Sequence, residues 1–505
     1  LKAITPTSID PETIKVLDPA AGSGHILVEV YEVLREIYLE RGYRLREIPE
    51  LILTKNIYGL DIDDRAAQLA GFALMMKARE DDRRNLEGNQ KEGSTGGLFD
   101  GLDDAEGFVQ PTGIYKEYFE LIQMLKSVFL QAKTLGSLIQ INSQHLQNLV
   151  GLKELLQAKD KGSDPSAKRA AIELMQIVSQ AIILAQQYNV VIANPPYMGL
   201  KFQNATLKAF MKKDYSEFSK DIFASFMVRC SLFTKEGGQT SFVTPYVWMF
   251  IISYESLRNY FYLNSPFTSL IQLEYNSFSP ACIPVCCFST QKGINEKFKG
   301  TFINLARFKG SDNQSPRTIE AINSEISDYK YHFSSSDLNN IPGKPLIYWA
   351  EEKILESFSD EINYQKVGAK STLRKGMSTG DNPKFVRVWS EINLASSNIT
   401  QENDTPDLKW FAYNNGGEYR KWYGNIDRVV NWEKDGFDIK NFFDDRGNLR
   451  SVARGVDQKF KTMLSWTSLS STNLGVRYYE DKFLSDQNGN FIIDTEDELY
   501  FLHLN

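Results

Sequence analysis

Apolar residues in the first part of the chain alternate between two patterns. "IKVLDPA" (14–20) and "NIYGLDID" (56–63) are short apolar runs of the kind that form buried strands. Each run precedes a segment with apolar residues at three- and four-residue spacing, which predicts helices over 25–40 and 64–80. The order strand, helix, strand, helix is typical of a parallel sheet covered by helices, so the sequence predicts an α/β fold.

The helical pattern then becomes longer than a simple crossover requires. Residues 81–113 are rich in Gly, Asp and Glu and are expected to form a loop. Residues 114–187 have helical spacing that is interrupted at 159–168, so we expect a helical insertion at about 81–187. After it we expect a strand at 189–193, a helix at 220–237, a strand at 238–245 and a β-hairpin from 270–278 and 283–292.

Two boundaries follow from changes in composition. We expect the α/β domain to cover residues 1–310 and a mixed, polar connecting region to cover 311–365. From 366 to 505 the chain contains Gly, Asn, Trp, Tyr and short strand-like pieces such as "KFVRVWS". This last part predicts a second domain of mixed α/β structure that is richer in strands.

Charge and cysteine content narrow the classes of function. The net charge of −7 excludes a wholly basic nucleic-acid binder but leaves room for a local basic face. Cys230, Cys282, Cys286 and Cys287 lack zinc-ligand spacing, and the histidines are scattered, so no metal is expected. No apolar run reaches membrane-span length and no signal peptide is recognised, so we expect a cytoplasmic protein. Because the chain starts at Leu1, almost directly on a motif, we also expect it to be part of a longer protein.

A glycine-containing turn follows the first predicted strand. Glycines at 22 and 24 allow backbone to approach a ligand closely, and the next helix begins there with free N–H donors. Asp61 ends the second predicted strand, where a carboxylate can accept both hydroxyls of a ribose. The alternative is that Asp61 only caps the following helix. A single G-x-G is weak evidence, and the third glycine of the dinucleotide fingerprint is replaced by Leu27.

A second corner, "VVIANPPYMG" (190–199), ends another predicted strand of the same sheet. Asn194 offers a side-chain carbonyl and Pro195 a backbone carbonyl, and the adjacent prolines hold both acceptors in place. Tyr197 offers a flat face on which a base can stack. Two fixed acceptors aimed at an exocyclic amine would draw its nitrogen towards sp³ geometry and make it more nucleophilic. The alternative is a strand-terminating turn without chemistry.

Together, "VLDPAAGSG" and "ANPPY" resemble the motifs of adenine-N6 DNA methyltransferases. The resemblance implies a Rossmann-like class I fold that binds S-adenosyl-L-methionine, with double-stranded DNA as substrate. It implies that the catalytic residues are Asn194, Pro195, Pro196 and Tyr197, and that the target adenine meets Tyr197 and Phe278. It implies that the cofactor is bound by Asp18, Pro19, Ala20, Gly22, Gly24, Asp61, Ile62 and Asp221. The family's third motif is matched weakly by "GLFDGL" (97–102), and an upstream aromatic motif of the family is not recognised before Asp18.

The second domain begins with a basic segment. Residues 366–390 contain six basic residues and one acid, as contact with phosphates would require. "GMSTGDNPKF" within it resembles the start of recognition domains in fused methyltransferases. We therefore expect DNA to be contacted by Lys370, Arg374, Lys375, Lys384 and Arg387. The alternative is a solvated domain with an aromatic core.

These segments, with "GLDIDDRAAQLAGFALMMKARE" and "LGSLIQI" (135–141), resemble the PglX family of adenine-specific methyltransferases from BREX and phage-growth-limitation defence systems. The resemblance implies methylation of host DNA and other defence-system proteins as partners. Three alternatives remain: part of a fused restriction–modification enzyme, a DNA-binding specificity module inactive in methyl transfer, and a protein-glutamine N-methyltransferase.

Overall fold

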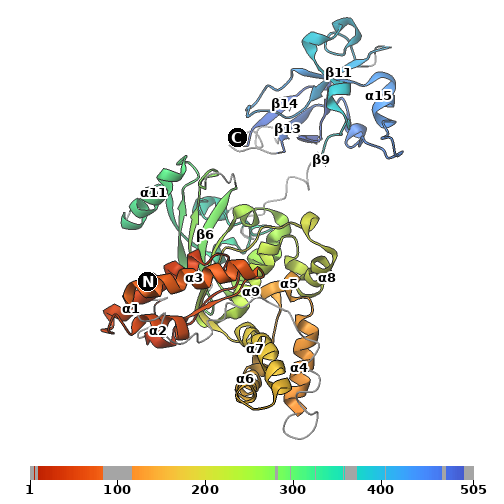
Figure 1. Cartoon of the computed structure of the whole chain (residues 1–505). Coiled ribbons are helices and arrows are strands. Elements are labelled where there is room, and N and C mark those ends of the chain that lie inside the picture. The colour runs from red at the N-terminus through yellow and green to blue at the C-terminus, as the bar shows by residue number, and fades with distance from the viewer. Residues whose placement is uncertain are drawn as a thin grey trace. The chain divides into compact units, whose positions relative to one another are not determined.

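The computed structural model divides the chain into two units, Leu1–Ile362 and Asn363–Asn505, which are treated separately below (Figure 1). The residues that the structure describes are 5, 9–82, 116–278, 283–295, 297–324, 326–356, 358, 372–403, 405, 407–468 and 474–493. The loop expected at 81–113 therefore lies almost entirely outside the described residues. The segment 97–102 lies outside them completely.

The first unit is built on an eight-stranded sheet with the strand order β2-β1-β3-β4-β6-β5-β7-β8. Its strands are β1 Val16–Asp18, β2 Ile57–Gly59, β3 Tyr188–Ala193, β4 Thr234–Pro245, β5 Phe267–Gln272, β6 Val285–Gln291, β7 Lys299–Asn304 and β8 Lys330–Ser334. The first four strands in this order are parallel. β6 is antiparallel to both β4 and β5, which confirms the expected hairpin.

Helices connect these strands and cover the sheet. Their bounds are α1 His25–Glu40, α2 Ile48–Leu51, α3 Asp64–Asp81, α4 Lys116–Phe129, α5 Ala132–Leu135, α6 Leu146–Asp160, α7 Pro165–Ala185, α8 Ala205–Asp214, α9 Ile222–Phe233, α10 Glu255–Asn264, α11 Ser311–Asn323 and α12 Glu352–Glu356. In Figure 1, α4, α6 and α7 extend from the sheet as a group of their own. Helices thus occupy the described part of the expected insertion.

Alternation along the strands sends neighbouring side chains into two different cores. Val16 of β1 and Val190 of β3 pack with α1, α2 and α3. Leu17 and Val191, the next residue of each strand, pack instead with the helices of the insertion and with α9. This two-residue period is what a parallel strand buried on both faces requires, and it confirms the predicted α/β class.

The sheet continues beyond the boundary expected near residue 310. α11 follows β7, and β8 then pairs antiparallel with β7 from Lys330 to Ser334. The segment expected as a connecting region therefore contributes a helix and an edge strand to the first unit. The sequence analysis missed this strand because "KYHFS" has no regular apolar alternation, and Lys330, Tyr331 and His332 are not buried.

The second unit contains two four-stranded sheets, ordered β10-β12-β11-β15 and β14-β13-β16-β9. Its elements are β9 Thr372–Arg374, α14 Asn382–Phe385, β10 Val386–Val388, β11 Trp410–Asn414, β12 Arg428–Asn431, α15 Glu433–Lys440, β13 Met463–Thr467, β14 Val476–Tyr479, β15 Phe483–Ser485 and β16 Gly489–Ile493. Short strands outnumber helices among the described residues, as the composition predicted.

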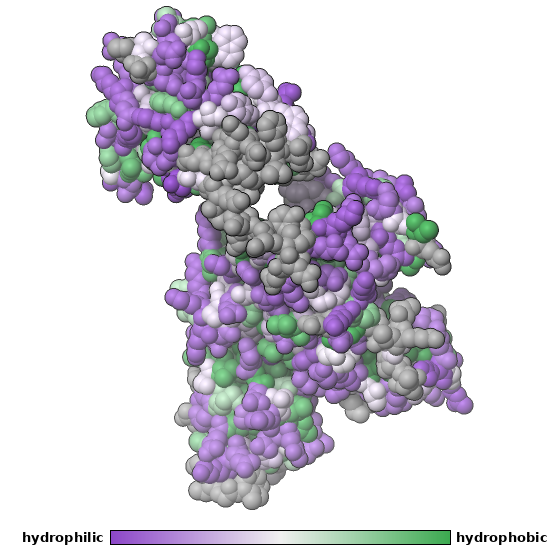
Figure 2. Space-filling model, turned by 180° about the vertical axis from the view of Figure 1, so that it is seen from behind, coloured by the Kyte–Doolittle hydropathy of each residue, from purple (hydrophilic) through white to green (hydrophobic). Residues whose placement is uncertain are grey.

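The surface is mainly polar. On the face drawn in Figure 2, hydrophilic residues predominate and hydrophobic residues lie between them in small groups. Among the described residues, no helix combines the length and the apolar character that crossing a membrane requires.

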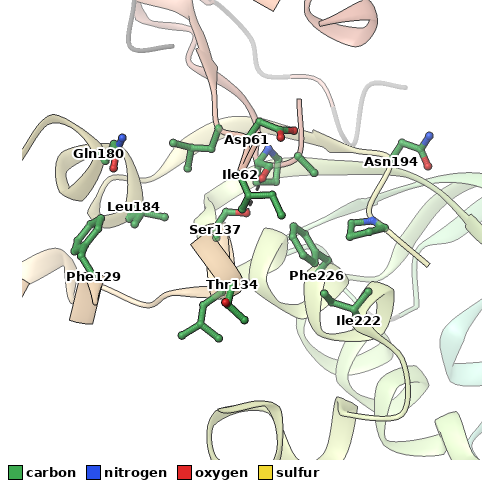
Figure 3. Close-up of a pocket in the computed structure, with 16 residues that line it drawn as sticks. Asp61, Ile62, Phe129, Thr134, Ser137, Gln180, Leu184, Asn194, Ile222 and Phe226 are labelled. Carbon is green, nitrogen blue, oxygen red and sulfur yellow. Dashed lines mark hydrogen bonds between the residues drawn. The ribbon is translucent and has the colours of Figure 1, made fainter. Parts of the chain in front are cut away.

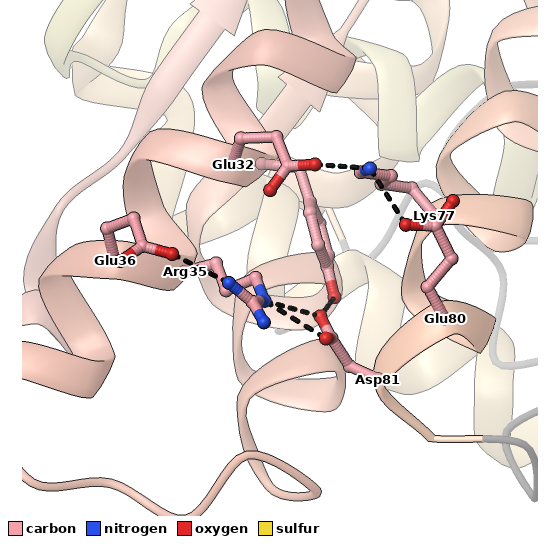
Figure 4. Close-up of polar contacts among 7 residues, drawn as sticks. Glu32, Arg35, Glu36, Lys77, Glu80 and Asp81 are labelled. Carbon is pink, nitrogen blue, oxygen red and sulfur yellow. Dashed lines mark hydrogen bonds and ion pairs between the residues drawn. The ribbon is translucent and has the colours of Figure 1, made fainter.

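A polar network joins α1 to α3 (Figure 4). Arg35 Nε donates to both carboxylate oxygens of Asp81 at 3.0 Å, and the hydroxyl of buried Tyr31 donates to Asp81 Oδ2 at 3.1 Å. Lys77 on α3 pairs with Glu32 on α1 and with Glu80. Since the Asp81 side chain is only 8% exposed, its pairing is shielded from water and fixes the two helices that follow β1 and β2.

We expect Asp81→Ala to lower the free energy of unfolding by about 1–3 kcal/mol, because it leaves the buried Tyr31 hydroxyl without its acceptor. Chemical denaturation measures this effect. The matched control is Glu36→Ala, since Glu36 also pairs with Arg35 but its side chain is 64% exposed; it should change stability by less than about 0.5 kcal/mol. Equal effects of the two substitutions would contradict this account.

Candidate active site

The site forms where the strand order reverses. β1 lies between β2 and β3, parallel to both, so the carboxyl ends of these strands open on one edge. The chain leaves β1 through α1 towards β2 and later returns on the other side of β1 as β3. Open α/β sheets bind ligands in the crevice at such a switch point.

The glycine turn closes over the end of β1. Gly22 N–H donates to Asp61 Oδ2 at 2.8 Å, and Asp63 N–H donates to Asp61 Oδ1 at 2.8 Å. Asp61 therefore ties the turn after β1 to the loop after β2. An added Cβ at Gly22, whose φ is +54°, would meet no atom within 4 Å, so backbone is open to an approaching ligand there.

Gly24 has a different reason to be glycine. Its φ is +85°, and an added Cβ would lie 2.7 Å from Ala70 Cα on α3. Any side chain would push α1 away from α3. Of the two predicted glycines, the geometry gives Gly24 a packing role and leaves Gly22 facing open space.

Asp18 is buried beneath the turn. Its Oδ1 accepts the Ala20 N–H at 3.0 Å, whereas Oδ2 is buried and has no hydrogen-bond partner within the described chain. Burial raises the pKa of Asp18 to about 7; the Ala20 N–H opposes this rise and the charge of Asp61 adds to it. A buried acceptor left in this state is ready for a positively charged or donor group of a ligand.

A pocket of about 320 Å³ lies beside this turn (Figure 3). Six of the predicted site residues line this pocket: Pro19, Ala20, Asp61, Ile62, Asn194 and Pro196. Asn194 lies at one end of the pocket, and Phe129 and Gln180 lie at the opposite end. The structure thus joins the glycine motif and the Asn-Pro-Pro-Tyr corner in one cavity of the size that small-molecule ligands occupy.

The far wall comes from the helical insertion, which the sequence analysis did not assign to the site. This wall consists of Phe129, Thr134, Leu135, Gly136, Ser137, Gln180 and Leu184. Ser137, in the short helix η6 Gly136–Leu138, donates its hydroxyl to the carbonyl of Pro19 at 2.5 Å. The "LGSLIQI" run, in which two small residues follow a helix, was a sequence signal for this wall. The local sequence does not indicate which strand end the run contacts.

α9 supplies the floor of the pocket through Ile222 and Phe226. Deeper in the same helix, Arg229 is fully buried and donates to the carbonyls of Ser137 (3.0 Å), Ile139 (2.7 Å) and Leu184 (3.1 Å). Its guanidinium also lies 3.7 Å from the centre of the Phe233 ring. Arg229 therefore holds the insertion wall against the sheet.

The Asn194 carboxamide is held by a neighbour. The Tyr197 hydroxyl lies 3.0 Å from Asn194 Oδ1 and 3.0 Å from the Val243 carbonyl, and its single proton can serve one of them at a time. Burial raises the pKa of Tyr197 well above its usual range, so the hydroxyl keeps this proton. Because a carbonyl oxygen has two lone pairs, Asn194 Oδ1 can still accept a second hydrogen bond.

The structure places Asp221 and Phe278 outside the pocket lining. Asp221 caps α9 and accepts the Met198 N–H at 2.9 Å, so it holds the loop that follows Tyr197. Phe278 lies exposed, six residues after β5 ends on the same edge of the sheet as β3. Their predicted contacts with cofactor and target base stay predictions.

The predicted DNA-contacting residues of the second unit lie at its surface, mostly engaged with their own domain. Arg374 lies 4.0 Å from Asp457, Arg387 donates to the carbonyls of Pro383 and Val386, and the Lys384 ammonium lies 4.4 Å from the centre of the Phe442 ring. Lys375 is exposed, and Lys370 lies outside the described residues.

The residues of "GMSTGDNPKF" have a role in the fold of the second unit. Met377 and Phe385 are buried in the core of the second unit. Between them Thr379 Oγ1 accepts the Asp381 N–H, and Asp381 caps the short helix α14. This segment therefore builds a capped turn. Within the described part of the chain, no cluster of three metal-ligating side chains occurs.

Two family models match this first unit. The Eco57I restriction-modification methylase model matches residues 55–278, and the DNA-methyltransferase domain of MmeI matches residues 9–96. The two matched regions together include both motifs that line the pocket.

Curated relatives extend the likeness over nearly the whole chain. The adenine-specific methyltransferase BrxX of Escherichia coli O9:H4 (strain HS) is 37% identical over 531 residues, which cover 99% of this chain and 42% of that protein. The adenine-specific methyltransferase PglX of Lacticaseibacillus casei (strain Zhang) is 33% identical and covers 95% of this chain and 40% of that protein. This chain is similar to the BrxX and PglX adenine-specific methyltransferases, and it spans about two fifths of the length of these relatives. The predicted resemblance to the PglX family is confirmed.

Solved structures with a similar fold point the same way. The type IIL restriction-modification enzyme MmeI in complex with DNA has a TM-score of 0.52 at 14% identity and covers 98% of this chain and 58% of its own. A nuclease-deletion mutant of the type ISP enzyme LlaGI, in complex with a DNA substrate mimic, also has a TM-score of 0.52, at 12% identity, with 97% and 41% coverage. These likenesses show the fold, and they confirm the predicted α/β fold class.

The pKa of Asp18 generates a stability prediction. Because the folded protein holds this proton up to about pH 7 and the unfolded chain releases it near pH 4, stability should fall as pH rises through this window. We expect Asp18→Asn to remove this fall and to gain up to about 4 kcal/mol at pH 8. Urea denaturation at pH 5 and pH 8 measures it. An identical pH dependence in both proteins would show that Asp18 is ionised in the fold.

Proposed function

We propose that this chain holds the catalytic part of a site-specific DNA adenine-N6 methyltransferase. The whole protein would transfer a methyl group from S-adenosyl-L-methionine to an adenine flipped out of double-stranded DNA, in a phage-defence system of the BREX type. The observation that supports this most is the single pocket that Asp61 and Asn194 both line. On one side, Asp61 can accept hydrogen bonds from the hydroxyls of a nucleoside-like cofactor. On the other side, Asn194 can accept a hydrogen bond from an amine.

The residues present fit the cofactor. The turn at Gly22 is open, the Asp18 Oδ2 atom is buried without a partner, and Asp61 stands at the end of β2 where ribose hydroxyls bind in nucleoside sites. When bound, S-adenosyl-L-methionine supplies an electrophilic methyl group. Pro19, Ala20 and Asp61 would hold it against Ile62 and the insertion wall.

Asn194 and Pro195 act on the adenine. The exocyclic amine is a weak nucleophile because its lone pair is delocalised into the ring. Asn194 Oδ1 and the Pro195 carbonyl would each accept one N6 hydrogen, which draws electron density back to the nitrogen. Both acceptors are fixed before the base arrives. Tyr197 holds the Asn194 side chain, and the proline ring and burial hold Pro195. These acceptors therefore need little reorganisation during the reaction. Tyr197 and Phe278 would pack on the flipped base.

We expect Asn194→Ala to lower adenine methylation by about 10²–10³-fold, because it removes one preorganised partner of the reacting amine. Transfer of labelled methyl groups to DNA measures the loss, with the protein at its natural length. Binding of S-adenosyl-L-methionine to the same variant is the control and should stay within about twofold, because Asn194 is exposed and holds no strand together.

Other outcomes of this experiment separate the alternatives. Label on protein instead of DNA would favour a protein-glutamine methyltransferase. Cofactor binding without transfer by the unsubstituted protein would favour an inactive specificity module. Undiminished adenine methylation by Asn194→Ala would overturn the mechanism.

DNA contact by the second unit rests on the basic segment at its start. Arg374 and Lys375 are exposed at the end of β9, next to the capped turn. Arg374 also contacts its own domain, through the Leu373 carbonyl at 3.1 Å and Asp457 at 4.0 Å, as Arg387 and Lys384 do through other groups. We infer that this edge follows the phosphate backbone.

We expect the double substitution Arg374→Gln/Lys375→Gln to weaken DNA binding and to reduce the slope of log K against log salt by roughly 0.9 for each lost phosphate contact. Fluorescence anisotropy at several salt concentrations measures the slope. Cofactor binding serves as the control for folding. A slope equal to that of the parent protein would place the DNA path elsewhere.

A restriction–modification role is the second candidate, supported by the Eco57I family match. Incubation of unmethylated plasmid with the natural-length protein and Mg²⁺ distinguishes the two. Cleavage would favour restriction–modification, and methylation without cleavage would favour a defence methyltransferase. A cytoplasmic location and defence-system partners remain predictions.

A further inference from the structure

The segment between the catalytic corner and α9 carries an unusual surface. Residues 200–220 include five lysines, all of them exposed: Lys201, Lys208, Lys212, Lys213 and Lys220. In the described part of the chain the lysines that form ion pairs are others: Lys55, Lys77, Lys116, Lys133, Lys440 and Lys459. The segment also carries the acids Asp214 and Glu217, so five lysines and two acids give it a formal charge of +3, which on a chain with a net charge of −7 suits a polyanion.

Topology places this surface on the edge where the reaction would occur. β3 ends at Ala193 and α9 starts at Ile222, so the segment between them leaves the sheet at the carboxyl end of β3, and a bridge between Gly199 and Asp221 holds its two ends together. Residue 200 follows Asn194 by six positions. None of its lysines lines the cofactor pocket.

The segment is held firmly to the corner. Buried Gln203 donates its side-chain N–H to the Met198 carbonyl at 3.1 Å, and Asn204 caps α8 by accepting the Leu207 N–H at 2.8 Å. Leu207 and Met211 bury one face of α8, which leaves Lys208 and Lys212, one turn apart, on the exposed part. At the far end the Tyr215 hydroxyl donates to the Leu138 carbonyl at 2.8 Å.

Phe202 adds an aromatic ring to this basic surface. It sits in the short helix η8 Leu200–Phe202, where its N–H donates to the Gly199 carbonyl at 3.0 Å, and it is 76% exposed. Lys201 Nζ lies 5.9 Å from the centre of its ring. An exposed phenylalanine five residues after Tyr197 offers a ring on which a base can stack.

We propose that residues 200–220 form the surface by which the methyltransferase unit itself grips the DNA duplex next to the flipped adenine. The lysines contact phosphates, and Phe202 inserts between base pairs at the step that the flipped base has left. Wedge side chains of this kind stabilise unstacked steps, and base–aromatic stacking tolerates any sequence. The proposal rests on the proposed function, because it assumes a duplex with an extruded base as the ligand.

The phosphate contacts are tested with Lys208→Gln/Lys212→Gln. We expect weaker DNA binding and a salt slope reduced by about 1.8, from two lost contacts. The matched control is Lys235→Gln/Lys299→Gln, two exposed lysines that begin β4 and β7 at the opposite edge of the sheet. This control should leave the slope unchanged. Equal slopes for all three proteins, while the parent methylates DNA, would overturn the proposal.

The wedge is tested with Phe202→Ala on DNA that carries 2-aminopurine at the target position. We expect lower fluorescence from the flipped base and about tenfold lower kcat/KM on paired DNA. A mismatch opposite the target adenine should restore most of the loss, because an unpaired base needs no wedge. Phe72→Ala, which removes an equally large ring that is 65% exposed on α3, is the control and should behave as the parent protein.

The outcomes separate this inference from the proposed function. Failure of the parent protein to methylate DNA would contradict both the proposed function and this inference. Normal methylation by the parent, with Phe202→Ala equal to Phe72→Ala on paired DNA, would overturn the wedge alone. A loss in Phe202→Ala that a mismatch does not relieve would assign Phe202 to folding or to another protein partner.

Discussion

The parallel pairing of β1 between β2 and β3 is the constraint on which the rest of the site depends. Val16 and Leu17 are each paired on both sides, so three strand ends are fixed within one crevice. The turn at Gly22, the Asp61 carboxylate and the Asn194 corner follow these ends directly. The sheet does not depend on the shape of the turn, of the Asp61 loop or of the Asn194 corner. These three parts come together only because the strand order reverses at β1.

A second constraint is the buried Arg229. Removing a guanidinium from water is costly, and here three backbone carbonyls and the Phe233 ring compensate for it. Burial lowers the pKa of Arg229 to about 10, so the group remains charged at neutral pH. The arrangement makes the insertion wall part of the sheet domain, since Ser137 and Leu184 line the pocket and also bind this arginine.

The same edge of the sheet carries two kinds of surface. The pocket is enclosed by apolar side chains and a few fixed polar atoms, whereas the segment after Tyr197 is basic and exposed. Asp221 links them, because it caps α9 beneath the pocket and holds Met198 at the start of that segment. A small cofactor and a large polyanion can therefore meet at Asn194 without sharing residues.

The sequence by itself determined the motifs, the α/β class and the succession of the main strands along the chain, because these depend on local spacing and on the residues that end each strand. Asp18, Asp61 and Asn194 were found this way. Only the tertiary structure decided that the insertion forms the far wall, since Ser137 and Pro19 are 118 residues apart and no local pattern encodes their contact. It also decided that Gly24 serves helix packing and that "GMSTGDNPKF" builds a capped turn, because close approach and burial are properties of the packed chain.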